Sequence, residues 1–424
     1  MIYSPHPLKH FLVSAILFGA KILRICFARR EEGMVLLVPP TYPNSLGDEA
    51  MMCSVIAELR PMGFRHVDVL SYDSNLPWCE KISGIHAEYG YGGLSTRRRF
   101  SAIIQLVLAT LKARHLILLG ADVLDGGYGN WHANTKLDLL TILRRAGVKV
   151  QVAGFSFKHG SSARAVSAFR ELGPKALYTP RDPASLNRFV RSTGLPAELG
   201  ADIAFLLSGN VKSSSARNWV NFQRAAGGLV LGWNINGHLR RYCADDDLSN
   251  YILAHAKLLV QLLSLEPSLR IVLIPHDSLN SSQTICDSDP DVALALYREV
   301  STQFGDRIHL AALPNDAATV AGICENLHAA VSCRMHLAIA CLRAGVPVMG
   351  WEYQDKVTGL LAGHFGMPEA VLELEELHHT GPTAERIHDF MVHRTTHATK
   401  IKQKLPLVRN LARQNFSACS RSPR

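Results

Sequence analysis

The sequence predicts an α/β protein with two Rossmann-like domains facing a cleft, together with an amphipathic N-terminal helix and a basic C-terminal tail. Three observations carry this prediction. Short apolar runs alternate with segments of helical period after Gly33, as in a parallel sheet covered by helices on both faces. The chain has 424 residues, which is long for a single core. A polar stretch near its middle separates two such series.

The first series occupies the N-terminal half. Its apolar runs predict strands, and its stretches of helical spacing predict the helices that cover them. The expected strands are 34–38, 67–71, 115–119, 148–153 and 176–178, and the expected helices are about 49–62, 100–113 and 137–146.

The second series follows the polar stretch 208–226, which has no clear period and is the best candidate for a linker. Its expected strands are 228–233, 270–274 and 308–310, its helices are 252–265, 292–304 and 319–326, and the segment 331–357 reads as strand, helix and strand. The expected organisation is a terminal segment (1–32), a first domain (33–210), a linker (211–226), a second domain (227–375), and a helix with a basic tail (376–424).

Positive charge is concentrated at the two ends of the chain. The net charge is +9, and the stretch from Arg394 to Arg424 holds eight Lys or Arg and no acids. The stretch from Met1 to Glu32 adds a further +3, which leaves the body between them at −2. A nucleic-acid-binding protein would carry its basic stripe on the folded body, so that class is disfavoured. The pattern favours an anionic membrane surface, with simply solvated tails as the alternative.

The apolar segment 11–27 is short for a membrane span, because it has 17 residues and contains Lys21 and Arg24. Its apolar residues fall on one helical face, which favours a helix lying at a membrane interface. A true span and a helix packed on the body remain the alternatives. The nine cysteines form no CxxC pair, so neither a zinc site nor a disulfide framework is expected, and no cluster of side chains suggests another metal.

The segment 331–357 contains the most informative candidate site. Arg334 and His336 fall where a buried strand gives way to a helix, and Lys356 comes just past the following strand. Free backbone N–H groups and the positive end of the helix dipole point to the same place at a helix start. Together with these side chains they predict an anion-binding site, against the alternative of a solvated first turn.

Two loops after predicted strands of the first domain carry further candidates. In the loop after 34–38, Asp48 is placed to cap the next helix, Gly47 allows close backbone approach, and Asn44 and Asp48 could hydrogen-bond a polyhydroxylated substrate. The loop 116–130 has four glycines and Asp122. It lacks the GxGxxG and GK[ST] patterns, so a dinucleotide site or a P-loop is disfavoured.

Two more candidates follow strands in the same way. Asp182 before Pro183 predicts a helix start, which leaves Arg181 at the end of a strand, where it could reach an anion or form a salt bridge. His276 directly follows the strand 270–274, where it could titrate near neutrality and serve as acid or base, or be an ordinary loop histidine.

Taken together, these loops resemble the polysaccharide pyruvyl transferase family. The matching pieces lie in order along residues 34–360 and are Asn44-Ser-Leu-Gly-Asp-Glu-Ala50, the glycine loop 120–129, Arg181-Asp182, Asp202 in LGADIAF, Ile274-Pro-His-Asp277, Arg334-Met-His336, and Gly345-Val-Pro347 through Lys356. The sequence departs from the family at the glycine loop, where Gly-Ala-Asp stands for a run of three glycines.

The resemblance implies two halves similar to GT-B glycosyltransferases, with the acceptor on the first and the donor on the second. It also implies phosphoenolpyruvate as donor and co-substrate, with a pair of sugar hydroxyls as acceptor and no further cofactor. The family's arginine-x-histidine donor motif falls on Arg334 and His336. We expect His336 to contact phosphate and act as general acid, and His276 or Asp48 to activate the acceptor. The expected binding residues are Arg334, Arg181, Asn44, Gly47, Asp122 and Lys356.

The expected function is therefore a pyruvyl transferase that forms a pyruvate ketal on a surface or extracellular polysaccharide, or on its lipid-linked precursor. The expected location is the cytoplasm, peripheral to the inner face of the membrane, with homo-oligomerisation left open. A glycosyltransferase that uses a nucleotide-sugar is one alternative function. A non-catalytic polysaccharide-assembly protein is the other.

Overall fold

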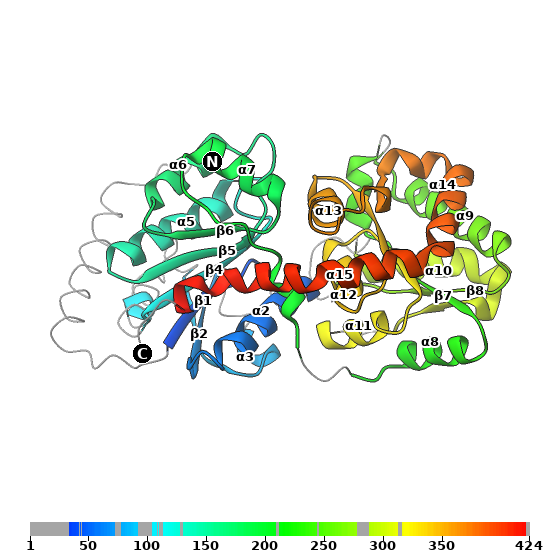
Figure 1. Ribbon diagram of the computed structural model, residues 1–424, viewed down its shortest axis with the longest axis horizontal. Helices are drawn as coiled ribbons and strands as arrows, with labels where there is room; N and C mark the ends of the chain where they lie inside the picture. The colour runs from blue at the N-terminus through cyan, green and yellow to red at the C-terminus, as the bar shows by residue number, and fades with distance from the viewer. Residues whose placement is uncertain are drawn as a thin grey trace. The chain divides into compact units, whose positions relative to one another are not determined.

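The computed structural model describes residues 34–420 apart from 42, 44, 73–77, 92–103, 108, 110–112, 128–129, 209–211, 244–245, 278–287 and 313–315. It contains two compact units, each built on its own parallel sheet (Figure 1). Unit 1 comprises Met1–Pro43, Met51–Leu206 and Leu411–Arg424, and unit 2 comprises Asn44–Ala50 and Leu207–Asn410. The predicted interfacial helix over 11–27 lies outside the described residues.

The sheet of unit 1 has six parallel strands in the order β3-β2-β1-β4-β5-β6. They are β1 (Met34–Val38), β2 (His66–Ser71), β3 (Ile85–Gly90), β4 (His115–Ala121), β5 (Lys149–Phe155) and β6 (Leu177–Pro180). Every residue of β1 and β4 is buried, because helices cover both faces of the sheet. Figure 1 shows α5 (Asn130–Arg145), α6 (Ala163–Leu172) and α7 (Pro183–Thr193) on one face, with α2 (Leu46–Leu59) and α3 (Trp78–Lys81) on the other.

An aromatic cluster forms much of the core of unit 1. Phe155, the last residue of β5, contacts Phe169 of α6 and Phe189 of α7, and the ring centroids of the three lie 5.1–5.8 Å apart. Phe189 is aligned by the start of α7, where Asp182 accepts a hydrogen bond from the Ser185 N–H (2.7 Å) and Pro183 occupies the first turn. The helix start predicted at Asp182-Pro183 is thus confirmed.

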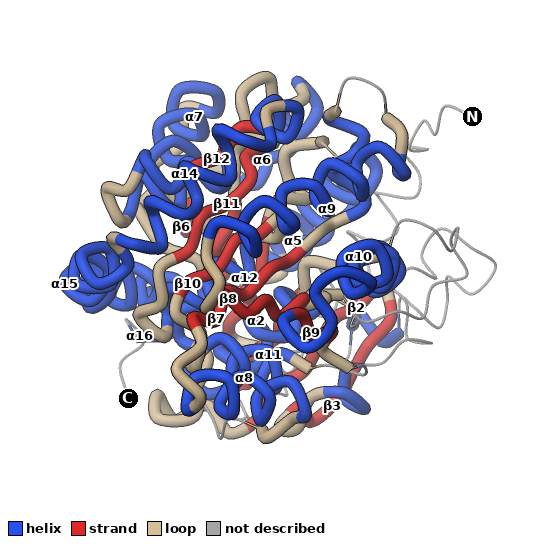
Figure 2. The backbone as a smooth tube through the Cα atoms, turned by 90° about the vertical axis from the view of Figure 1, so that its right-hand side faces the viewer, coloured by secondary structure: helices blue, strands red, loops and turns tan. Residues whose placement is uncertain are grey.

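The sheet of unit 2 has the order β12-β11-β10-β7-β8-β9, again all parallel. Its strands are β7 (Leu229–Asn234), β8 (Leu269–Leu273), β9 (Ile308–Leu310), β10 (Ala329–Ser332), β11 (Val348–Glu352) and β12 (Val371–Glu373). The principal helices are α8 (Ser215–Ala225), α9 (Leu248–Leu265), α10 (Asp289–Phe304), α11 (Ala317–Cys324), α12 (Met335–Arg343), α14 (Thr380–Val392) and α15 (Arg394–Arg413) (Figure 2). Numbered along the chain, both sheets have the Rossmann order 3-2-1-4-5-6.

Helix α9 is the one helix in the described part of the chain that is long and apolar enough to cross a membrane. It contacts α10 and α14 within unit 2. Its buried residues include His255, Leu259 and Leu262, which recur at helical spacing. The apolar character of α9 is therefore accounted for in part by packing.

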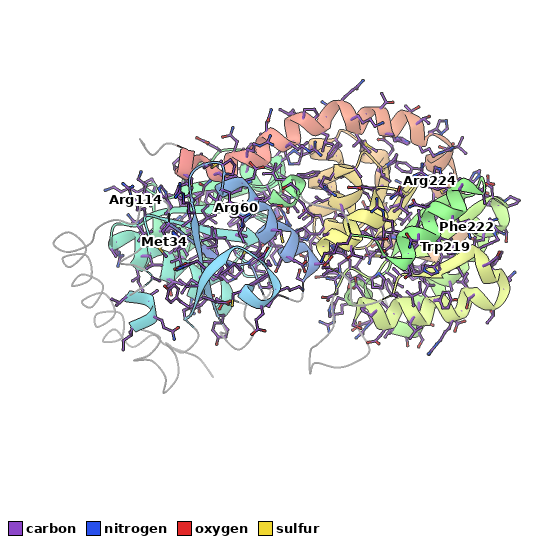
Figure 3. All side chains as sticks on the ribbon, turned by 90° about the horizontal axis from the view of Figure 1, so that it is seen from below. Met34, Arg60, Arg114, Trp219, Phe222 and Arg224 are labelled. Carbon is purple, nitrogen blue, oxygen red and sulfur yellow. The ribbon has the colours of Figure 1, made fainter. Side chains whose placement is uncertain are left out.

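The segment predicted to be an irregular linker over 211–226 is a helix from Ser215 to Ala225, so this prediction is wrong there. Ser214 caps α8 by accepting a hydrogen bond from the Arg217 N–H (3.1 Å). Its buried stripe consists of a small, a medium and a polar residue (Ala216, Val220 and Gln223), which hides the helical period from a count of apolar residues. Figure 3 labels Trp219, Phe222 and Arg224 on this helix.

The basic tail is also an ordered element over most of its length. Helix α15 buries Ile401, Leu405 and Val408 on one face and exposes Lys402 and Lys404. Beyond it, Asn415 is fully buried in unit 1, where its Oδ1 accepts hydrogen bonds from the Gly154 N–H and the Thr179 hydroxyl, both 2.8 Å. The tail was expected to be solvated or membrane-bound, but most of the charges in 394–420 sit on a helix with a buried face.

Candidate functional site

Four neighbouring strands of unit 2 deliver polar residues to one edge of the sheet. The strands are β11, β10, β7 and β8, and parallel strands end on the same side. The chain adds strands outward from β7 in one direction up to β9 and then outward from β10 in the other, so the strand order switches between β7 and β10. Ligands bind at such a switch point in open α/β sheets. Arg334 and His336 follow β10, His276 follows β8, and Lys356 follows β11. The structure therefore gathers these four predicted residues at one edge.

Arg334 is held by a buried carboxylate that sequence reasoning missed. Its Nε lies 3.1 and 3.2 Å from the two carboxylate oxygens of Asp289, and its Nη2 lies 2.7 Å from Oδ1. A longer contact of 3.4 Å joins Nη2 to Asp277. Burial lowers the pKa of the guanidinium, but the Asp289 carboxylate outweighs burial and raises it. Arg334 stays charged, and Nη1 takes no part in these contacts.

Asp289 is the shared partner of the loops around it. It is fully buried at the start of α10 and accepts hydrogen bonds from the His276 N–H and the Asn234 side chain, both 3.2 Å. Asn234 in turn donates to the carbonyl of Ile274 (2.9 Å). The only local signal was the Ser288-Asp-Pro-Asp291 pattern, which reads as an ordinary helix start.

His276 is neutral, contrary to the expectation that it titrates near neutrality. Its side chain is buried, and neither ring nitrogen has a hydrogen-bond partner among the described residues. Burial lowers its pKa well below 6.5, and the adjacent charges of His336 and Arg334 lower it further. A neutral imidazole can accept a proton or a hydrogen bond, but it cannot serve as a general acid in this state.

The loop after β1 reaches this site, because Asn44–Ala50 belongs to unit 2. Gly47 lies against the imidazole of His336, such that a Cβ at position 47 would sit 2.1 Å from Nδ1. Ser45 pairs with Asp277 through an isolated backbone bridge, and the Glu49 carboxylate accepts the Ala317 N–H (3.1 Å) at the start of α11. The close approach predicted for Gly47 is thus an approach to His336.

Asp48 was predicted to cap the following helix from outside, and this prediction is wrong. Helix α2 begins at Leu46, so Asp48 lies in its first turn, buried, and its N–H donates to the Ser45 hydroxyl (3.3 Å). The prediction for Asn44 lies outside the described residues.

The loop after β11 is fixed by a carboxylate at the end of the strand. Oε1 of Glu352 accepts the N–H groups of Tyr353 (2.7 Å) and Gln354 (2.8 Å), and Oε2 accepts that of Thr358 (2.6 Å). The turn passes through Asp355 at φ 59°. It buries Lys356, whose Nζ lies 4.7 Å from the centre of the Tyr353 ring. This cation–π contact brings the cation beside the loop that carries Tyr353.

The predicted residues of unit 1 form a separate group. The Arg181 guanidinium is buried and donates to Asp202 (2.9 Å) and to the Ser156 hydroxyl (2.7 Å). Burial lowers the pKa of Arg181, but Asp202, Asp122 and Asp182 together raise it. An anion-binding role for Arg181 stays a prediction, whereas its ion pair within the fold is observed. Asp125 organises the glycine loop by accepting the N–H groups of Gly127 (2.8 Å) and Lys158 (3.2 Å).

Across the described ranges, no three His, Cys, Asp or Glu side chains converge to hold a metal ion.

Two parallel sheets of Rossmann order in one chain define a protein of the GT-B type, and comparisons with solved structures agree. The UDP-GlcNAc 2-epimerase of Neisseria meningitidis, bound to UDP-GlcNAc, matches with TM-score 0.57 and 13% identity over 92% of this chain and 100% of that one. A putative UDP-N-acetylglucosamine 2-epimerase of Listeria monocytogenes matches with TM-score 0.56 and 11% identity over 91% and 93%. A UDP-glucosyltransferase of Polygonum tinctorium matches with TM-score 0.53 and 11% identity over 92% and 98%. At this identity the likeness shows the fold alone.

A family model described as polysaccharide pyruvyl transferase matches residues 46–355, and the chain belongs to that family. The match includes the segments that carry Gly47, His276, Arg334 and His336. A search of curated proteins finds no match.

Proposed function

We propose that the protein transfers pyruvate from phosphoenolpyruvate to two hydroxyls of a sugar, forming a cyclic ketal on a surface or extracellular polysaccharide or on its lipid-linked precursor. Family membership makes the protein a transferase that acts on a sugar acceptor. The observation that carries the choice of donor is Arg334 and His336 at the start of α12, on the edge where the strand order reverses. Guanidinium, imidazole and the positive end of the helix dipole suit a small ligand with a carboxylate and a phosphate.

The reaction needs one proton donor and one proton acceptor. The methylene carbon of the donor gains a proton, a sugar hydroxyl attacks the adjacent enol carbon, phosphate departs, and a second hydroxyl closes the ring. The two hydroxyl protons balance the new methyl group and the departing phosphate. We assign protonation of the methylene carbon to His336, which lies beside the anion-binding helix start.

Proton acceptance from the sugar hydroxyl suits His276. Burial keeps its pKa well below 6.5, so its ring is neutral and can accept a proton, and the negative charge of the bound donor would raise this pKa and strengthen it as a base. Asp48 is the second candidate for this role, since it lies in the segment that contacts His336. In this proposal Arg334 holds the donor with the guanidinium edge that Asp289 leaves open, and Lys356 adds positive charge nearby. Asn44, Asp122 and Arg181 are proposed to bind substrate from their own loops.

We place the enzyme in the cytoplasm, at the inner face of the membrane, where lipid-linked sugar intermediates are accessible. Lys402 and Lys404 are exposed on α15, a helix without acids, and this supports electrostatic attraction to anionic lipid. Binding to vesicles with and without phosphatidylglycerol, at low and high salt, tests this location. Equal recovery with both vesicle types would contradict it.

The activity is tested by phosphate release from phosphoenolpyruvate in the presence of sugar acceptors. We expect release with the wild-type protein, and a fall of roughly a hundredfold or more in Arg334→Lys and His336→Asn, because lysine cannot reproduce a planar fork of donors. Absence of release and of donor binding, combined with binding of a uridine nucleotide, would favour a nucleotide-sugar glycosyltransferase instead. Polymer production that survives both substitutions in cells would favour a non-catalytic assembly protein.

A further inference from the structure

Two tyrosines meet where the loops after β7 and β11 come together. Tyr242 is the last residue of the 3₁₀ helix η3 (Gly237–Tyr242), and Tyr353 directly follows β11. Their ring centroids are 5.5 Å apart and the ring planes are tilted by 47°. Strands β7 and β11 flank β10 on its two sides, so the pair spans the end of the strand that leads to Arg334.

Both tyrosines are held in place. The Gln354 side-chain amide donates to the Tyr242 hydroxyl (2.5 Å), and the Gln354 backbone is itself fixed by Glu352. On the other loop, Asn236 caps η3 by accepting the His238 N–H (3.0 Å). The rings are thus pre-organised by hydrogen bonds, which lowers the entropy lost when a ligand is bound.

One member of this pair is exposed. Tyr242 is 46% exposed, whereas the Lys356 ammonium lies over the Tyr353 ring. A large ring left partly in water still has apolar surface to bury against a ligand. Tyr242 is therefore the member of the pair that a ligand can reach.

The surroundings of Tyr242 suit an uncharged ligand with many hydroxyls. Arg240, in the same 3₁₀ helix, donates to the Asp246 carboxylate (2.7 Å) and to the Asp246 carbonyl (3.0 Å). This ion pair is neutral as a whole, and it offers donors and acceptors on the 3₁₀ helix that ends at Tyr242 and on the loop after it.

The pair also lies close to the proposed donor site. Ser332, the last residue of β10, pairs with Gly350 of β11, and Arg334 and Tyr353 lie two and three residues beyond these partners. Tyr353 and Arg334 therefore follow neighbouring strand ends, and the Tyr242 ring contacts Tyr353.

We propose that Tyr242, backed by Tyr353, is a stacking surface for a pyranose ring of the acceptor and positions that sugar beside Arg334. The axial C–H bonds of a pyranose carry partial positive charge and face the negative π surface of the ring, while its hydroxyls stay at the rim. The assignment of this sugar as the acceptor rests on the proposed function, but the binding of a sugar ring does not. It places acceptor recognition on unit 2, in addition to the loops predicted on unit 1.

Binding is tested first, without phosphoenolpyruvate. The full-length protein is titrated with methyl β-glucopyranoside, methyl β-galactopyranoside and methyl β-mannopyranoside, and saturation-transfer NMR reports contact. We expect at least one glycoside to bind, Tyr242→Ala to weaken it roughly tenfold, and Tyr242→Phe to retain most of the affinity. Phe222→Ala, which removes an exposed aromatic ring from α8 (68% exposed; Figure 3), serves as the matched control and should leave binding unchanged.

Kinetics separate stacking from a general structural role. With an active acceptor, Tyr242→Ala should raise the KM for the acceptor roughly tenfold and leave the KM for phosphoenolpyruvate unchanged. An equal rise in both values would assign Tyr242 to the stability of the site and overturn the proposal.

The outcomes also distinguish this proposal from the proposed function. Glycoside binding that depends on Tyr242, without phosphate release from phosphoenolpyruvate, would keep the stacking surface and reject the pyruvyl transfer. Failure of all three glycosides to bind, or equal affinity in wild type and Tyr242→Ala, overturns the stacking surface. Binding of uridine diphosphate that depends on Tyr242 when glycoside binding does not would assign the ring to a nucleobase and overturn the proposal.

Discussion

The imidazole of His336 lies so close to position 47 that only a hydrogen atom fits there. A methyl group at this position would overlap the ring at 2.1 Å from Nδ1 and 2.3 Å from Cγ. The ring is part of the site and the backbone of Gly47 is buried, so any accommodation moves His336. Gly47 therefore acts by setting the position of a side chain on another loop.

We expect Gly47→Ala to lower kcat/KM roughly a hundredfold, because displacement of a reacting group by about 1 Å has this effect. Steady-state phosphate release measures it, with circular dichroism to confirm that the protein is folded. Gly381→Ala is the matched control, since a Cβ at that position meets nothing within 4 Å. Wild-type activity in Gly47→Ala would mean that the ring can shift without consequence.

Asp289 joins Arg334, His276 and Asn234 from a fully buried position. We expect Asp289→Asn to lower the free energy of unfolding by about 2 kcal/mol, since it leaves the largely buried Arg334 charge with only its longer contact to Asp277 (3.4 Å). Urea unfolding followed by circular dichroism measures this loss.

Asp291→Asn is the control for this substitution, because Asp291 lies in the same helical turn and contacts Ser288 (2.5 Å). Equal unfolding midpoints for the two variants would contradict a special role of Asp289.

For single residues, the sequence predicted those that can be recognised from their immediate neighbours in the chain. Arg334 and His336 stand at a strand-to-helix boundary that the apolar pattern reveals. Asp289 is 45 residues from Arg334, and Tyr242 and Tyr353 are on loops that only the sheet order brings together. Arg181 was placed correctly at the end of a strand, but its partner Asp202 depends on tertiary structure.

At the scale of elements, strands buried on both faces were the easiest to predict. Strand β1 is a continuous apolar run, β4, β5 and β8 are mostly apolar, and the structure places all four within a few residues of the expected bounds. The edge strand β3 was missed because Ile85–Gly90 is half-exposed and has a mixed composition. Helix α8 was missed because its narrow buried stripe includes Ala216 and Gln223.

The C-terminal segment after α15 has its own anchor. Asn415 accepts two hydrogen bonds through Oδ1 and donates two through Nδ2, to Ala201 O (2.9 Å) and Ala412 O (2.8 Å). We expect Asn415→Ala to lower the free energy of unfolding of unit 1 by about 3 kcal/mol, because it leaves buried donors and acceptors unpaired.

Thermal unfolding followed by circular dichroism checks this expectation. Gln403→Ala, at an exposed position of α15, should stay within about 0.5 kcal/mol of wild type. An Asn415→Ala protein as stable as that control would show that water replaces the lost partners.

At the scale of the whole molecule, several buried histidines are kept neutral. Burial lowers the pKa of His255 to about 3 and of His115 to about 4, with Lys149 and Arg114 adding to the shift at His115. The pKa of the half-buried His328 is also lowered to about 4, mainly by burial and further by the charges of Arg224 and Arg394. His255 is enclosed by the rings of Trp233, Tyr251 and Trp351.

These shifts predict loss of stability in acid. Above pH 6.5 these imidazole rings are neutral in both the folded and the unfolded state, so they cost the folded protein no stability. As the pH falls from 6.5 to about 4, the unfolded chain takes up protons that the folded protein does not, which costs about 1.4 kcal/mol per pH unit for each of the buried His115 and His255, and less for the partly exposed His328.

Urea unfolding at several pH values measures the slope of stability against pH. His255→Phe should reduce that slope by the contribution of one proton, about 1.4 kcal/mol per pH unit. His159→Phe, at an exposed position, should leave the slope unchanged. An unchanged slope in His255→Phe would contradict a neutral ring at this position.

The chain passes between the two units four times, because residues 44–50 belong to unit 2 and residues 411–424 return to unit 1. Neither unit is therefore a contiguous stretch of the gene. A chimera joining halves of two relatives at a single junction after Leu206 would pair a foreign Gly47 segment with His336 and a foreign Asn415 with the first sheet. A chimera that keeps each unit whole needs three further junctions, after Pro43, Ala50 and Asn410.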